Sequence, residues 1–460
     1  MKYQITLLLV VLTSISCTNS GKNIDKAAIV QTSMDANAQS ILSDSTITSL
    51  SIGILKDGIG YTSHYGELDA GKGNPPNNET IYEIAAVTKT MTGTLVAQAV
   101  VDGKLNLDDD IRKYLNNDYP NFQYKYEVIT IRHLVTHTSR LPNNMLGVSE
   151  LLQNRDDNSF QKIEEIAKNY NKEMFFEQME NAVLDTIPGL IYEYNNLAPN
   201  LMAHILENVY QKSFDELLND FIFKKSEMTT TKMRLSEDEK VRLANGYNGK
   251  GKLMPNMPMP MWGAEGGMKS TTPDLIKYMR LHLDTINPTV VESHRVNYID
   301  NPNHSLGYYW VVGKNTEGTY YSHHGGAMGM QNWFFVFPAY NMGVSVITNS
   351  SSEGTGQLLY NTVMGIVNDL KPNGKKSIEK EITPKTMQNV DEGIALYHQL
   401  KKDNLDTYNF ENQNELNNVG YALLAKNKVK DAIKIFALLV SEFPKFPNPY
   451  DSLGEAYFIN

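Results

Sequence analysis

The chain has 460 residues, which is enough for two or three domains with sizeable cores. Its 42 Lys and Arg residues against 52 Asp and Glu residues give a formal net charge of −10. With no block of basic residues in the chain, this balance argues against nucleic acid as a partner and against a polybasic membrane patch. The single cysteine excludes an internal disulfide.

Residues 1–16 have the pattern of a secretion signal. Lys2 supplies the positive start, residues 5–12 form an apolar run too short to span a bilayer, and small residues precede Cys17. Cys17 resembles the lipidated cysteine of a bacterial lipoprotein, although Ser14 stands where that motif usually has Leu. The alternative is an ordinary signal with a chance cysteine. We expect an exported lipoprotein, anchored at Cys17 to the cell membrane or outer membrane and facing the periplasm or exterior. Residues 17–26 would form a tether.

The next segments alternate helix and strand patterns. The apolar spacing of residues 27–42 predicts a helix, and residues 50–61 read as two strands around a turn at Asp57 and Gly58. The stretch IYEIAAVTKTMTG (residues 81–93) then opens a helix that carries Lys89. Ala86 lies three residues earlier, so both positions share one helix face. Lysine there could take a proton from a hydroxyl nucleophile, but Ala86 offers no hydroxyl, and Thr88 lies on another face.

The middle of the chain contains a histidine pair and a long helical region. His133 and His137 lie four residues apart in IRHLVTHTSRLP, which could suggest a metal pair; without a third ligand or a helix-borne Glu, structural histidines are the better interpretation. Residues 143–185 are mostly helical in pattern. The segment YNN follows, with Tyr194 and Asn196.

The remaining segments before residue 371 read as a sheet with flanking helices. Residues 252–261, rich in Met and Pro, predict an irregular loop, and residues 273–280 a helix. Residues 306–312, 319–323, 332–337 and 343–349 predict strands of an antiparallel sheet, and residues 353–370 a closing helix. His323 lies in YSHHGG at the end of the second of these strands.

Together, AAVTK, YNN and HHGG resemble the three motifs of the serine β-lactamase and D,D-peptidase superfamily, S-x-x-K, Y-x-N and K-T-G, the last in a variant with His in place of Lys. The likeness runs from about residue 39 to about residue 370 and is strongest to the class C β-lactamase, esterase and D-aminopeptidase branch. It implies an α/β (α+β) fold, an antiparallel sheet flanked by helices plus a helical subdomain, over residues 27–370. Arg140 stands where the family has Gly, a position that costs free energy if φ is positive.

The resemblance also implies roles for single residues. Ala86 occupies the nucleophile position, and Lys89 and Tyr194 would transfer protons. The backbone N–H groups of Ala86 and Gly326 would form the oxyanion hole. The substrate-binding residues would be Asn196, His323 and Gly325, and His323 would either contact a carboxylate or polar tail of the substrate or aid proton transfer. The ligand would be a small molecule or a peptide, and neither a cofactor nor a metal is implied.

The C-terminal part departs from this family. Residues 371–390 are polar, contain Pro372 and Gly374, and predict a linker. In residues 391–460 an apolar pattern around Gly420 recurs 34 residues later around Gly454, which resembles the tetratricopeptide helix pair. So short an array does not bury its own core, so we expect it to lean on the hydrolase domain or on a protein partner.

Three functional interpretations follow. The first is a secreted or lipid-anchored serine-hydrolase-family protein of the esterase, peptidase or amide and lactam hydrolase type, inactive as written because of Ala86, whether that residue is natural or engineered. The second is a non-catalytic pseudo-enzyme that binds peptide or cell-wall fragments. The third is an interaction scaffold that recruits a partner through residues 391–460. On the resemblance, His323 favours an esterase or a peptidase over a penicillin-destroying enzyme.

Overall fold

A computed structural model describes residues 26–459, except 157, 260, 302–303, 316–317, 372–375 and 406. The predicted signal peptide, Cys17 and all but the last residue of the predicted tether lie outside the described residues. Within the described part, no helix is long and apolar enough to cross a membrane.

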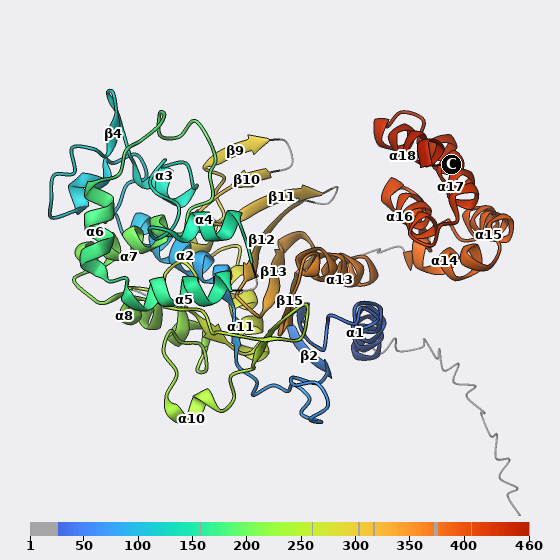
Figure 1. Ribbon diagram of the computed structural model, residues 1–460, viewed down its shortest axis with the longest axis horizontal. Helices are drawn as coiled ribbons and strands as arrows, with labels where there is room; N and C mark the ends of the chain where they lie inside the picture. The colour runs from blue at the N-terminus through green and yellow to red at the C-terminus, as the bar shows by residue number, and fades with distance from the viewer. Residues whose placement is uncertain are drawn as a thin grey trace, which may run out of the picture.

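An antiparallel sheet of eight strands is the centre of the fold (Figure 1). The hairpin of β1 and β2 turns at Asp57 and Gly58, whose φ angles of 51° and 80° suit a type I′ turn, as the sequence predicts. In spatial order the strands are β2 (Ile59–Gly66), β1 (Ser49–Lys56), β14 (Met342–Thr348), β13 (Gln331–Phe337), β12 (Gly318–Gly326), β11 (Val311–Asn315), β10 (His304–Leu306) and β9 (Tyr298–Asn301).

The predicted strand over residues 306–312 is wrong in its middle. Strand β10 ends at Leu306 and β11 begins at Val311. Tyr309 has a φ of 62°, which lies in the left-handed region and cannot continue a strand. The Gly307 backbone N–H instead donates to the Trp310 carbonyl oxygen, 3.0 Å away. The tight connection that results carries the Tyr309 ring toward the helical side of the molecule.

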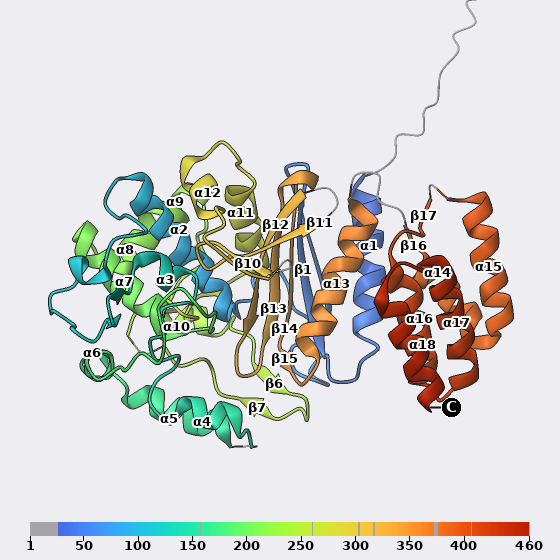
Figure 2. The same ribbon diagram turned by 90° about the horizontal axis from the view of Figure 1, so that it is seen from above.

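Two helices, α1 (Lys26–Ile41) and α13 (Thr355–Leu370), cover one face of the sheet (Figure 2). The alternation along β14 explains the division of the core: Val344 and Val346 face these helices, where they join Leu359 and Val363, whereas Ile347 faces the other side. The elements from α1 to α13, residues 26 to 370, therefore pack around this sheet.

The opposite face packs on α11 (Thr272–His282) and on a helical subdomain, and these share the largest core cluster. This side also contains α2 (Thr88–Val101), α3 (Ile131–Val135), α4 (Val148–Gln153), α5 (Ser159–Asn169), α6 (Lys172–Glu180), α7 (Leu197–Tyr210), α8 (Phe214–Leu218), α9 (Lys224–Ser226), α10 (Glu237–Lys240) and α12 (Pro288–Ser293). The shorter strands are β3 (Tyr82–Glu83), β4 (Gln123–Tyr124), β5 (Glu127–Val128), β6 (Gly246–Asn248), β7 (Leu253–Met254), β8 (Lys269–Ser270) and β15 (Ser350–Ser351).

The C-terminal part is helical and lies beyond α1 and α13 from the sheet (Figure 2). It buries a core of its own, so the expectation that it does not is wrong: α14 and α15 add apolar residues to those of the predicted helix pair. The predicted linker over residues 371–390 is wrong in its second half, because α14 occupies Ile378–Gln388. The other elements are β16 (Lys376–Ser377), α15 (Val390–Asp403), β17 (Tyr408–Asn409), α16 (Gln413–Leu424), α17 (Val429–Glu442) and α18 (Pro447–Ile459). The tetratricopeptide assignment of these helices stays a prediction.

Candidate active-site cleft

A cavity of about 580 Å³ lies between the helical subdomain and the sheet. Six of the seven residues that the sequence predicts for the site line it: Ala86, Lys89, Tyr194, Asn196, His323 and Gly326. They come from the start of α2, the segment before α7 and the end of β12, which are far apart in the sequence. The fold therefore brings the three predicted motifs to one cleft.

Gly325, the seventh predicted residue, is not part of the cavity wall. It is buried where β12 packs against the 3₁₀ turn η1 (Ala85–Val87). A Cβ atom at this position would lie 2.3 Å from the Ile84 carbonyl oxygen and 2.4 Å from the Asn332 side-chain nitrogen. Glycine is thus required for close backbone approach, and the assignment of Gly325 as a substrate-binding residue is corrected to a role in packing.

Lys89 is 1% exposed, and hydrogen bonds hold its amine. Its Nζ donates to Asn196 Oδ1 at 2.9 Å and to the Glu265 carbonyl oxygen at 2.6 Å. Nζ also lies 4.8 Å from the centroid of the Tyr194 ring, so the side chain points toward Tyr194 as the resemblance implies. Burial lowers the pKa of the Lys89 amine, and the nearby Glu265 carboxyl opposes that shift.

Glu265 is a cavity residue that the sequence reasoning missed. Its Oε2 atom is buried and has no hydrogen-bond partner among the described residues. Burial raises the pKa of this carboxyl, while the Lys89 charge acts in the opposite direction. The signal in the sequence was a lone acidic residue inside the glycine turn GAEGG, which the resemblance alone did not single out.

His323 is a neutral ring at the end of β12. Its Nδ1 lies 2.7 Å from the His324 carbonyl oxygen, so Nδ1–H donates there and Nε2 is left as the acceptor. Burial and the Lys89 charge lower the pKa of His323 to about 3. A neutral acceptor does not attract a carboxylate, so of the two roles that the resemblance implies, help in proton transfer fits this ring better.

Two other hydroxyl groups could be considered as nucleophiles in place of the missing one. Thr88 is buried, and its Oγ1 accepts a hydrogen bond from the Met268 backbone N–H at 3.2 Å. Ser351 lines the cavity, where its Oγ accepts a hydrogen bond from the Gln331 side chain at 3.0 Å. An amide cannot act as a general base, so this pairing does not activate Ser351.

The segment IRHLVTHTSR (residues 131–140) contains the histidine pair and an arginine. Backbone N–H groups donate to His133 Nδ1 and to His137 Nδ1, each at 3.2 Å. In the described part of the chain, no three His, Cys, Asp or Glu side chains come together as a metal site would need. Arg140 has a φ of 63°, and its guanidinium forms ion pairs with Asp185 and Glu193. These pairs compensate for the unfavourable backbone conformation that the sequence comparison anticipated.

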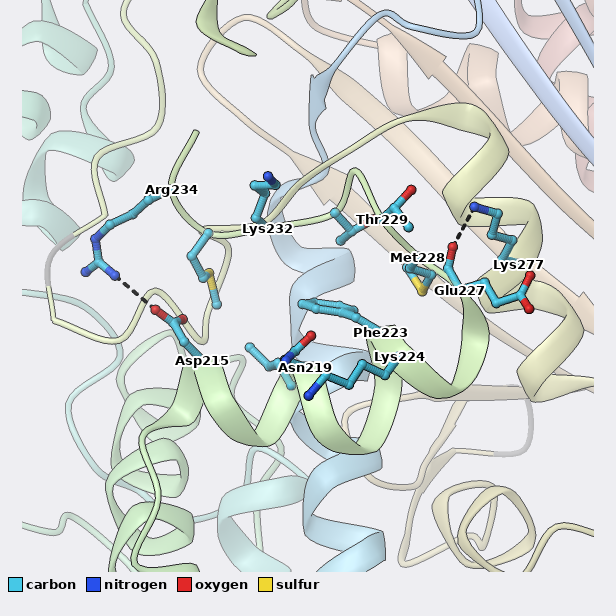
Figure 3. A pocket seen from close by; sticks show the side chains of 13 residues that line it. Asp215, Asn219, Phe223, Lys224, Glu227, Met228, Thr229, Lys232, Arg234 and Lys277 are labelled. Carbon is cyan, nitrogen blue, oxygen red and sulfur yellow. Dashed lines mark hydrogen bonds and ion pairs between the residues drawn. The ribbon is translucent and has the colours of Figure 1, made fainter. Parts of the chain in front are cut away.

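A second cavity, of about 880 Å³, lies between the α8–α9 region and residues 228–234 (Figure 3). Its rim has four cationic side chains, but each has a carboxylate partner. The pairs are Arg234 with Asp215, Lys277 with Asp274, Lys224 with Asp220, and Lys232 with Glu239. Because carboxylates of the protein already pair with these cationic groups, the cavity has fewer charged groups available to bind a ligand, and the cleft at Ala86 is the better candidate site.

The comparisons with known proteins agree with this geometry. The sequence model of the family described as Beta-lactamase matches residues 28–365. "Protein flp" of Staphylococcus aureus (strain N315) is 25% identical over 348 residues, which are 71% of this chain and 66% of that protein. A "Beta-lactamase" of Pseudomonas fluorescens is 24% identical over 251 residues, 54% of this chain and 64% of that protein. The chain thus spans slightly under two thirds of the length of these two relatives.

Two solved structures have the same fold. One is a "Beta-Lactamase/D-Alanine Carboxypeptidase" from Pseudomonas syringae, with a TM-score of 0.63 and 18% identity, covering 75% of this chain and 99% of that one. The other, from Yersinia pestis and titled as complexed with citrate, has a TM-score of 0.60 and 22% identity, covering 74% and 99%. At this identity the likeness establishes the fold.

Proposed function

Because the chain belongs to the beta-lactamase family, we propose that its cleft binds the carbonyl group of a peptide, ester or lactam without forming an acyl-enzyme. One observation carries the proposal. Lys89, Asn196 and Tyr194 keep a connected arrangement around a residue that has no nucleophilic atom, Ala86. The cleft and its polar side chains are therefore present, although residue 86 has no hydroxyl oxygen to act as a nucleophile.

The surroundings of Ala86 support binding of a carbonyl oxygen. Ala86 and Gly326 both line the cavity, and their backbone N–H groups do not depend on the side chain at residue 86. Such donors stabilise negative charge on a carbonyl oxygen in a site that excludes water. Asn196, whose Oδ1 is engaged by Lys89 and whose Nδ2 donates to Asn144 Oδ1 at 2.8 Å, would orient an amide of the ligand beside them.

The same geometry argues against hydrolysis through a covalent intermediate. The family reaction needs a hydroxyl oxygen that attacks the carbonyl carbon and gives its proton to the lysine or tyrosine. Removing the nucleophile of such a unit costs orders of magnitude in rate. We therefore favour the pseudo-enzyme over an active hydrolase. Because the two structural neighbours are named as D-alanine carboxypeptidases, a peptide with a C-terminal D-alanine is the first ligand to test.

The experiment that tests this function compares the protein with its Ala86→Ser variant. Both are incubated with a fluorophosphonate and with a β-lactam, and the intact mass is measured. We expect no adduct on the Ala86 protein. On the variant we expect a single adduct at residue 86, because Ser adds one oxygen on the face that Lys89 shares. An adduct on another cleft residue of the unaltered protein would contradict the proposal.

An unlabelled Ala86→Ser variant also has a defined meaning. Reaction requires near-attack geometry, and a displacement of about 1 Å can cost about 100-fold in rate. A folded, unlabelled variant that still binds N-acetyl-D-alanyl-D-alanine in calorimetry would indicate a cleft that has become a binding site only. A variant with neither labelling nor binding would refute the proposal.

We also propose that the protein is exported and lipidated at Cys17, on the signal pattern of residues 1–17. Stable membrane attachment needs more than one acyl chain, as a bacterial lipoprotein has. Metabolic labelling with a fatty acid, in cells that express either the unaltered protein or its Cys17→Ala variant, tests this. Equal labelling of the two proteins would refute it.

The helical C-terminal part is the third element of the proposal, as a docking unit for a protein partner. Its last helix, α18, exposes three aromatic side chains, Tyr450, Tyr457 and Phe458, between 51% and 92%. Clusters of exposed aromatic groups are typical of interaction sites. Loss of partner capture in a Tyr457→Ala, Phe458→Ala double variant that keeps its helix content is the expected result.

A further inference from the structure

Besides Glu265 Oε2, two polar atoms in the wall of the cleft have no hydrogen-bond partner among the described residues. They are His137 Nε2 and the Tyr309 hydroxyl oxygen. The two side chains are 2% and 1% exposed, and their ring centroids lie 5.1 Å apart. Buried polar groups are paired in the great majority of proteins, so two unpaired ones in one cavity need an explanation.

The hydrogen-bonding character of His137 is fixed by its other nitrogen. The Asn195 backbone N–H donates to Nδ1 at 3.2 Å, so Nδ1 is the acceptor. Burial lowers the pKa of His137 well below its ordinary value, and the nearby Lys89 amine acts in the same direction. The ring is therefore neutral, and Nε2 carries the proton. The ring lines the cavity, and its Nε2–H donor has no acceptor among the described residues.

Both rings are carried by residues whose backbone conformation is energetically unfavourable. His137 has a φ of 57° and Tyr309 a φ of 62°, both in the left-handed region that residues with a side chain rarely adopt. His137 is held because its carbonyl oxygen accepts from the Glu193 N–H at 2.9 Å, and Tyr309 because its N–H donates to the Val135 carbonyl oxygen at 2.9 Å. Strained residues of this kind gather at ligand sites, where the rest of the fold compensates for them.

From these observations we propose that His137 Nε2–H and the Tyr309 hydroxyl form a subsite for a carboxylate oxygen of the ligand. The subsite lies beside the reaction position, because the His137 ring centroid is 4.7 Å from that of Tyr194. Both groups can donate, which favours an acceptor such as a carboxylate oxygen over an amine. The inference rests on the proposed function and specifies its ligand as a peptide-like compound with a free carboxylate.

The test is the Tyr309→Phe variant, which removes one oxygen and keeps the ring. The matched control is Tyr278→Phe. Tyr278 is equally buried but does not line the cleft, and its hydroxyl is paired with Thr90 and Thr94 at 3.1 and 3.3 Å. Two quantities are measured for each protein: the thermal midpoint without ligand, and the dissociation constant for N-acetyl-D-alanyl-D-alanine by calorimetry.

The proposal predicts opposite behaviour for the two variants. Tyr309→Phe should leave the midpoint unchanged or raise it by about 1–3 °C, because it removes an unpaired buried hydroxyl, and should weaken dipeptide binding about 10-fold or more. Tyr278→Phe should lower the midpoint and leave the dissociation constant unchanged, because it removes a buried hydroxyl that is hydrogen-bonded within the protein and does not line the cleft.

Any other outcome refutes the proposed subsite. It also shows whether the proposed function is refuted at the same time. Equal affinity of Tyr309→Phe and the unaltered protein refutes the subsite alone, and so does a clear fall in the ligand-free midpoint of Tyr309→Phe. If the unaltered protein does not bind the dipeptide while Ala86→Ser is acylated, the subsite is wrong and carbonyl recognition stands. If there is neither binding nor acylation, both fail.

Discussion

The amine of Lys89 has partners although the nucleophile is missing. A buried amine that lost its only partner would carry a desolvation penalty of about 1–3 kcal/mol. Here Asn196 Oδ1 and the Glu265 carbonyl oxygen accept from Nζ, at 2.9 and 2.6 Å. Lys89 is therefore stable in place without a hydroxyl at residue 86, which explains how the arrangement persists around Ala86.

Lys89 and Glu265 influence each other's protonation. Burial lowers the pKa of the first and raises that of the second, so desolvation pushes both groups toward their neutral forms, while their mutual attraction favours the charged pair. Glu265 also presents an unpaired oxygen in the cavity wall. A ligand N–H group that reaches Oε2 would hydrogen-bond to it, which agrees with a peptide-like ligand.

His323 should make the folded protein sensitive to mild acid. Its folded pKa of about 3 is below the value of about 6.5 in an unfolded chain. As the pH falls from about 6.5 to about 3, the unfolded state takes up the proton first, so stability falls by up to about 1.4 kcal/mol per pH unit on account of this ring. We expect His323→Gln to flatten the dependence of the unfolding free energy on pH by that amount near pH 5.

The measurement is urea unfolding at several pH values between 4 and 8, with His398→Gln as the control. His398 is exposed on α15, so its replacement removes an imidazole without touching the cleft. The same slope for His323→Gln and the unaltered protein would mean that the His323 ring is protonated as readily in the folded protein as in the unfolded chain.

The junction of η1 and β12 sets the position of the oxyanion-hole candidates Ala86 and Gly326. Ala85 has a φ of 45°, and Gly325 lies against the carbonyl group of Ile84. We expect Gly325→Ala to destabilise the protein by about 2–3 kcal/mol, since its Cβ would lie 2.3 Å from a backbone oxygen that cannot easily move. The displaced strand should also reduce acylation of an Ala86→Ser protein.

Gly326→Ala is the neighbouring control. Its added Cβ would lie 3.6 Å from the nearest heavy atom, His324 Cε1, which is an ordinary contact. We expect a change in stability within about 0.5 kcal/mol in urea unfolding. If the two variants lost equal stability, the close approach at Gly325 would not be the cause.

The sequence predicted the hairpin, most strands and the flanking helices, because their apolar residues in the sequence are the residues that the fold buries. The β1–β2 turn is specified by Asp57 and Gly58, and the alternation along β14 follows the two cores of the sheet. Helix α14 was missed because polar residues, Pro372 and Gly374 suggested a linker. Its buried face, Ile378, Ile382 and Thr386, has helical spacing, and this tertiary burial outweighs the composition.

The candidate site could be predicted in outline but not in its contacts. Motif order identified Ala86, Lys89 and Tyr194 as neighbours, and the fold places them on one cavity. The sequence did not identify three cavity residues, Glu265, His137 and Tyr309. The position of the first depends on a glycine turn, and the positions of the other two depend on left-handed backbone conformations. Gly325 was predicted to bind the ligand because a sequence motif gives the residue type at a position but not its surroundings. In the structure its Cα lies against the Ile84 carbonyl group and not against the cavity.

The two parts of the molecule meet through a polar contact. Lys380 of α14 donates to Asn37 Oδ1 at 2.8 Å, and Asn37 and Ser33 of α1 both donate to Asp369 of α13. The C-terminal helices bury their own apolar residues around Phe436, in a cluster separate from those of the sheet. Polar contacts of this kind couple domains weakly, so the two parts should unfold separately.

Phe436→Ala tests this separation. The ring is fully buried between α16 and α17, where it packs on Gly420 and meets Tyr421 edge to face at 5.2 Å. Its removal should destabilise the C-terminal helices by about 3–5 kcal/mol. In hydrogen exchange with mass spectrometry, residues 413–459 should lose protection while peptides of β13, β14 and α2 keep theirs, and dipeptide binding should not change. If the sheet lost protection together with the helices, the chain would be one cooperative unit, and the apolar core around Phe436 would support the cleft.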